Sequence, residues 1–81
     1  MSKEKLALQG AIILKERQIT NLRTRVKVIG VVLRDALAVY HLMHPEELDI
    51  DQIQANYEIF SSALRDLRQA EAELQELKAE V

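Results

Sequence analysis

The 81-residue chain lacks cysteine and tryptophan, and it has one proline and two glycines. Without cysteine it can form no disulfide framework and offers no thiolate for catalysis or metal binding. So few glycines and prolines argue against a β-sandwich, which needs many turns. The absence of cysteine is compatible with a cytoplasmic protein, and that is the localisation we expect.

Aromatic residues are also scarce, at two tyrosines and one phenylalanine. The core must therefore be built from Leu, Ile, Val and Ala, which dominate the 48% of hydrophobic residues. Together with 30% charged residues, this composition is typical of long helices and coiled coils. The length predicts a single domain, residues 1–81, with a core of barely sufficient size.

The longest apolar stretch, residues 25–44, is interrupted by Lys27, Arg34 and Asp35. A membrane-spanning helix needs about 20 mostly apolar residues, so we predict no membrane segment. Residues 6–14 faintly imitate a signal peptide. Gln9 interrupts them, however, and a charged triplet follows where small residues should mark cleavage, so we expect mature sequence.

Spacing within residues 3–43 predicts one long helix. Positions that alternate four and three residues apart are apolar with the single exception of Lys15: Leu8, Ile12, Lys15, Ile19, Leu22, Val26, Ile29, Leu33, Ala36, Tyr40 and Met43. Such heptads favour a coiled-coil helix over a strand, whose two faces here would both be mixed. Gly30 then lies in a helix interior, where it marks either close approach by another helix or a local weak point.

A second helix is predicted over residues 49–80, after a turn at 44–49. Pro45 cannot continue the first helix, and Asp49 and Gln52 have the spacing of a helix-capping box. The same alternation then resumes at Ile53, Tyr57, Phe60, Leu64, Leu67, Glu71, Leu74, Lys78 and Val81. Ala63, Ala70 and Leu77 flank this row at heptad spacing, which would allow close helix packing.

The charges indicate how the two helices pack. Residues 1–34 hold eight basic and two acidic side chains, a net charge of +6, whereas residues 35–81 hold three and eleven, a net charge of −8. With a short turn the helices would lie antiparallel, pairing Leu33 with Phe60, Arg23 with Glu71 and Lys15 with Lys78. We therefore predict an all-α antiparallel helical hairpin of coiled-coil type. An open chain with swapped connectivity is the alternative.

The predicted hairpin core comprises Val26, Ile29, Leu33, Tyr40, Ile53, Phe60, Leu64 and Leu67. A second apolar line on the first helix cannot be covered by the second helix as well. Its residues are the predicted interface: Val28, Val31, Val32, Asp35, Val39 and Leu42. A helix that is apolar most of the way round expects further burial, so we predict a homodimer that forms a four-helix bundle. Asp35 would pair with an arginine across this interface or specify its register.

No catalytic pattern is evident. The chain has no glycine-rich phosphate loop, no nucleophile–base set and no paired-carboxylate pocket, so we expect no enzyme, no small-molecule substrate and no cofactor. His41 and His44, followed by Glu46 and Glu47, resemble a metal site only superficially, because no further ligand pair supports them. We interpret them as polar residues at a helix end and predict no metal.

Residues 15–27 carry the alternative function. Arg17, Arg23, Arg25 and Lys27 could contact nucleic-acid phosphates, although no aromatic residue is interleaved for base stacking and the acidic helix would neutralise them. The preferred prediction is a non-enzymatic protein–protein interaction module, such as an adaptor, small chaperone or assembly factor. It would self-associate through the apolar surface of residues 26–43. A small nucleic-acid-associated regulator is the alternative.

Overall fold

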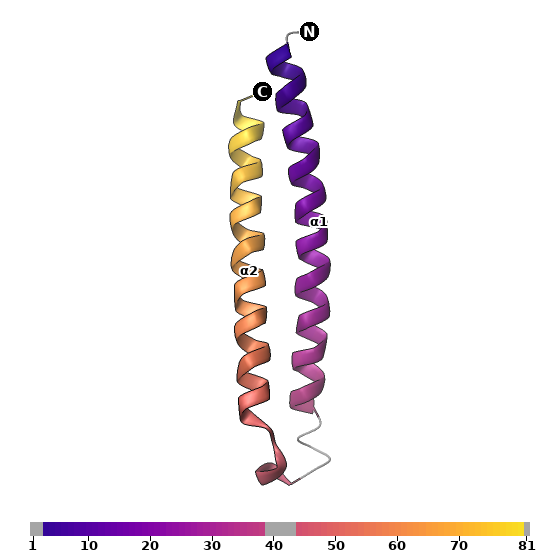
Figure 1. Ribbon diagram of the computed structural model, residues 1–81, viewed down its shortest axis with the longest axis vertical. Helices are drawn as coiled ribbons and strands as arrows, with labels where there is room; N and C mark the ends of the chain where they lie inside the picture. Colours follow the sequence, from indigo (N-terminus) through magenta and orange to yellow (C-terminus); the bar gives the residue numbers. More distant parts are fainter. Residues whose placement is uncertain (1–2, 39–43, 81) are drawn as a thin grey trace.

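The computed structural model describes residues 3–38 and 44–80. Helix α1 (Lys3–Ala38) is followed by a short 3-10 helix, η2 (Pro45–Glu47), and by helix α2 (Ile50–Ala79). Figure 1 shows α1 and α2 running antiparallel, with both chain ends at one end of the molecule and η2 at the other. The predicted all-α antiparallel hairpin is thus confirmed.

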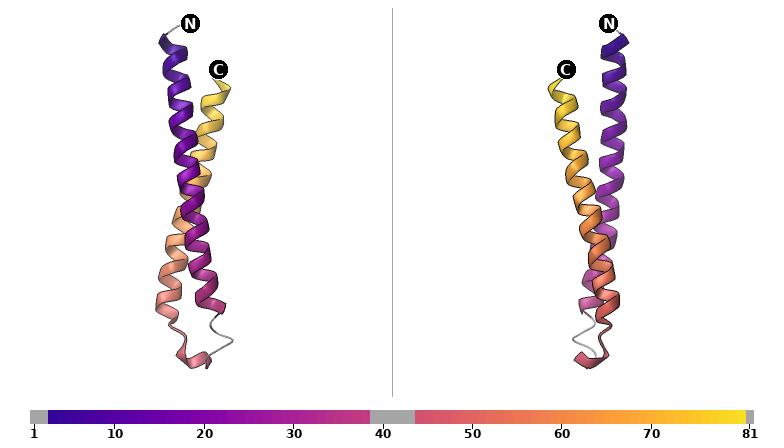
Figure 2. Two further views of the ribbon diagram at one scale, coloured as in Figure 1. Left: turned by 90° about the vertical axis from the view of Figure 1, so that its right-hand side faces the viewer. Right: turned by 60° about the vertical axis from the view of Figure 1, so that its left-hand side comes forward.

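The molecule is a rod measuring 65 × 14 × 14 Å, with a radius of gyration of 18.6 Å. A globular chain of this length would have a radius of gyration of about 12 Å. The two views of Figure 2 show that the helices cross each other along the rod. Across the described helices, no stretch combines the length and hydrophobicity that a membrane crossing requires.

The start of α2 follows from its capping residue. Asp49 Oδ1 accepts a 3.0 Å hydrogen bond from the backbone N–H of Gln52, as the spacing of these two residues predicts. The backbone N–H of Glu47 donates to the carbonyl of His44 and closes η2. The predicted end of the first helix at residue 43 lies outside the described residues.

The buried row of α1 is the row that the heptads predict. Ile19 is its most buried member. The other described positions are half-buried: Leu8, Ile12, Lys15, Leu22, Val26, Ile29, Leu33 and Ala36. Tyr40 and Met43 lie outside the described residues. Of the predicted hairpin-core residues on α2, Leu67 is buried and Ile53, Phe60 and Leu64 are half-buried.

On α2, six of the eight described positions of the predicted row are buried or half-buried, whereas Tyr57 and Lys78 are exposed. The buried residues of the helix are Ala63, Leu67 and Ala70. The helix is therefore rotated about its axis so that the flanking row of Ala63, Ala70 and Leu77 faces α1. Tyr57 and Lys78 of the predicted row lie outside the contact. Small alanine side chains let the two backbones approach closely, and the rotation of α2 moves Lys78 out of the contact between the helices.

The alignment of the helices also differs in part from the prediction. Arg23 pairs with Glu71 as expected, at 3.3 Å, but Lys15 binds Glu73 instead of facing Lys78. Phe60 lies against Gly30, where an added Cβ would be 3.3 Å from Phe60 Cε2. Of the two interpretations of Gly30, the structure supports close approach by the other helix.

Candidate functional site

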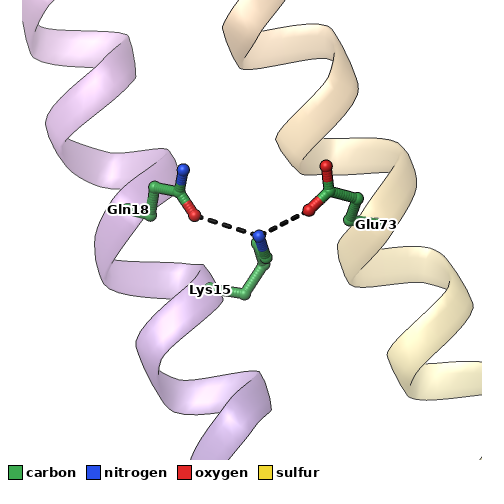
Figure 3. Close-up of polar contacts among 3 residues, drawn as sticks. All are labelled: Lys15, Gln18 and Glu73. Carbon is green, nitrogen blue, oxygen red and sulfur yellow. Dashed lines mark hydrogen bonds and ion pairs between the residues drawn. The ribbon is translucent and has the colours of Figure 1, made fainter.

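One face of the hairpin is identified by a polar contact near the open end. Lys15 Nζ donates hydrogen bonds to Gln18 Oε1 at 3.0 Å and to Glu73 Oε2 at 2.6 Å, and Figure 3 shows it between the two helices. Residues seven apart lie on the same side of a helix in a coiled-coil pair. The face that we name the lysine face therefore contains Gln18, Arg25 and Val32 of α1 and Ile59, Asp66 and Glu73 of α2.

The opposite face is identified by the pair of Arg23 and Glu71, which flanks the buried rows on their other side. The same heptad spacing defines the arginine face as Arg23, Gly30 and Leu37 of α1 and Ile50, Tyr57, Leu64 and Glu71 of α2. Both faces are charged toward the open end and apolar toward the turn. The turn-proximal half is thus the part of the hairpin suited to further packing.

Three valines of the predicted interface are exposed on α1. Val28 is 58% exposed, Val31 44% and Val32 49%. We call these three residues the valine surface. Val32 belongs to the lysine face, as does Ile59 across the groove on α2, so the apolar surface extends over both helices. Val39 and Leu42, the remaining apolar residues of the predicted interface, lie outside the described residues.

Asp35, the acidic member of the predicted interface, is exposed. Its Oδ1 atom accepts hydrogen bonds from Nε and Nη2 of the adjacent Arg34, at 3.3 and 3.2 Å. The structure therefore provides Asp35 with a partner on its own helix. A surface pair of this kind contributes about 0–1 kcal/mol to stability.

The sequence prediction missed three exposed apolar residues of α2 near the turn. They are Ile50, Tyr57 and Ile59. Tyr57 was expected to face α1, but the rotation of α2 about its axis places it on the arginine face. The heptad spacing of Ile50, Tyr57 and Leu64 was the available signal for a second apolar line on α2.

Shallow grooves follow both faces. A groove of about 380 Å³ on the lysine face is lined by Arg25 of α1 and by Ala55, Glu58, Ile59 and Ser62 of α2. A second, of about 640 Å³, lies on the arginine face nearer the open end. Its lining includes Ile19 and Leu74, with Arg23, Glu71 and Lys78 at its sides.

The charge of Glu73 is set by its contact with Lys15. The hydrogen bond from Lys15, followed by the charge of Lys15, lowers the pKa of Glu73 and keeps it a carboxylate. A general acid–base group working near neutral pH needs a shift in the opposite direction. Within residues 3–38 and 44–80, no three or more His, Asp or Glu side chains are placed to hold a metal ion. His44 is exposed beside η2, and His41 lies outside the described residues.

The candidate nucleic-acid residues do not form one patch. Arg23 lies on the arginine face and pairs with Glu71, while Arg25 lies on the lysine face. Arg17 and Lys27 are exposed at other positions around α1. Phosphate recognition gains affinity from several cations that reach one backbone together. Arg23 and Lys27 are one helical turn apart on the same side of α1, whereas Arg25 lies on the lysine face, away from them.

No protein-family model matches the chain, and no curated protein or solved structure matches it significantly.

Proposed function

We propose that the hairpin is a non-enzymatic protein–protein interaction module that self-associates through the valine surface. The observation that carries this proposal is the exposure of Val28, Val31 and Val32 within one helical turn. The α2 helix already covers the other side of α1, so it cannot also cover these valines. Contiguous apolar patches on small proteins generally mark sites of association.

The total surface supports the same conclusion. The hairpin exposes 6392 Å², whereas a folded monomer of this mass exposes about 5,000 Å². The excess, about 1,400 Å², is larger than the roughly 800 Å² that each partner buries in a standard protein interface. A second hairpin packed on the first would cover this excess and complete a four-helix bundle. Such a dimer would act as an adaptor, small chaperone or assembly factor.

Nucleic-acid binding through Arg17, Arg23, Arg25 and Lys27 is the weaker alternative. The pairing of Arg23 with Glu71 and the separate position of Arg25 on the lysine face argue against it. Filter binding to duplex DNA and to RNA at low salt tests it directly. Affinity that falls steeply with added salt would favour the alternative.

Sedimentation equilibrium tests self-association. The chain has a mass of 9.3 kDa, and we expect twice this value across the micromolar range. Val32→Asp should give the monomer mass while circular dichroism still reports a helical protein. Leu14→Asp is the matched control, because Leu14 is 66% exposed on the same helix but far from the valine surface. A monomeric wild type, or a dimeric Val32→Asp variant, would refute the proposal.

A further inference from the structure

Resting on the proposed self-association, we infer that the second copy packs on the lysine face with its turn at the same end of the bundle. In this arrangement α1 of each copy lies over α2 of the other. Arg25 then faces the partner's Asp66, and Val32 faces the partner's Ile59. The occupant of the surface is a second copy of the chain, and its orientation is fixed by charge.

The distribution of side chains on the lysine face suits this arrangement. From the turn toward the open end, α1 presents Val32 and then Arg25, whereas α2 presents Ile59 and then Asp66. Both helices are therefore apolar near the turn. Further along, α1 presents a cation and α2 an anion. The face is therefore complementary to the same face of a second copy when α1 of each copy lies over α2 of the other.

The lysine face also leaves charges available. Among the described residues, neither Arg25 nor Asp66 forms an ion pair within the hairpin, although both are exposed. On the arginine face, Arg23 and Glu71 already neutralise each other. Unpaired charges of opposite sign on one face can orient a second copy. Two charges that already pair within the hairpin neutralise each other and attract the charges of a second copy only weakly.

The symmetry of a dimer decides which helices meet. A two-fold axis along the rod places α1 over the partner's α2, so opposite charges meet and all neighbouring helices are antiparallel. A two-fold axis across the rod places α1 over the partner's α1. The net-positive α1 helices would then lie against each other, as would the net-negative α2 helices, at a cost in free energy.

The groove on the lysine face lies at the level along the hairpin axis that this contact requires. It is lined by Arg25 and Ile59, among others, and α2 residues near Phe60 lie level with Gly30. The groove is therefore level with Val28 and Val32. When the turns lie together, the partner's α1 passes over this groove at that same level, and its valine side chains can fill the groove.

Distance measurements between copies test the orientation. The chain has no cysteine, so Glu47→Cys gives a single exposed thiol in η2 for a spin label. Pulsed dipolar spectroscopy should give a distance of about 20–30 Å, the width of two hairpins with helices packed about 10 Å apart. A distance closer to the 65 Å length of the hairpin would overturn this inference and leave the dimer intact. A monomer without dipolar coupling would overturn the proposed self-association as well.

Charge exchange provides an independent test. The double variant Arg25→Glu/Asp66→Arg keeps opposite charges between its own two copies and should dimerise like the wild type. Mixed with isotopically labelled wild type, it should form less than the half share of mixed dimer that random exchange gives, measured by native mass spectrometry. An excess of mixed dimer indicates that like positions face each other and would overturn the inference.

A matched pair of substitutions tests which face is used. Ile59 and Tyr57 are two residues apart on α2, have similar exposures of 47% and 58%, and lie on opposite faces. Ile59→Asp should dissociate the dimer, whereas Tyr57→Asp should leave its mass unchanged. The reverse result would assign the interface to the arginine face and refute the proposed contact.

Discussion

Lys15 Nζ lies 2.6 Å from Glu73 Oε2, and this contact joins α1 to α2 near the open end of the hairpin. Lys15 is the one charged residue in the otherwise apolar row of α1, and its side chain is only 19% exposed. The carboxylate of Glu73 neutralises it there, with Gln18 accepting a second hydrogen bond. The positive charge of Lys15 is thereby neutralised, and Lys15 does not lie opposite Lys78 as expected.

This contact makes the stability of the hairpin depend on pH. The hydrogen bond and charge of Lys15 lower the pKa of Glu73. The contribution is therefore fully present above the ordinary carboxyl pKa and is lost as the pH falls through the lowered folded-state pKa. We expect Glu73→Gln to reduce the drop in melting temperature between pH 7 and pH 3. Thermal unfolding followed by circular dichroism measures it. Glu76→Gln is the control, because Glu76 is exposed and forms no ion pair with any residue that the structure describes, and it should retain the wild-type drop.

The close packing of the helices predicts sensitivity to volume at Ala70. This residue is 2% exposed, and a larger side chain there must separate the helices or distort its neighbours. We expect Ala70→Leu to lower the free energy of unfolding by about 1–3 kcal/mol in urea titrations. Ala72→Leu, two residues away at an exposed site, should change it by no more than about 0.5 kcal/mol. Equal stability of the two variants would contradict the packing of α2 described above.

The two glycines of α1 should respond differently to the same change. A Cβ at Gly30 would meet Phe60 Cε2 at 3.3 Å, whereas one at Gly10 would meet nothing within 4 Å. At Gly10, Gly→Leu should raise helix content, because leucine favours a helix by up to about 1 kcal/mol relative to glycine. At Gly30, the same change must displace the Phe60 ring and should destabilise the hairpin by about 1 kcal/mol or more. Urea unfolding and the helical circular-dichroism signal together distinguish the outcomes.

Much of the fold was determined by local sequence. The heptad row of α1, the proline at position 45 and the Asp49 cap act over one or two helical turns, so they can be read without knowing what packs nearby. The opposite charges of the two halves predict the antiparallel pairing, and Arg23 and Glu71 confirm it. The exposure of the valine surface likewise follows from a helix with more apolar residues than one partner can cover.

Only the tertiary structure decided which side of α2 faces α1. The predicted row through Tyr57 and Lys78 competes with the flanking row through Ala63 and Ala70, and the sequence alone does not rank the two. Leu64 packs against the core, whereas Tyr57 and Lys78 are exposed. The alanine row is chosen because small side chains allow the backbones to approach, a gain that depends on both helices at once. That choice moves Tyr57 to the arginine face and pairs Lys15 with Glu73. The sequence thus determines a hairpin with more apolar surface than its two helices can bury, and the packing of the helices decides where that surface lies.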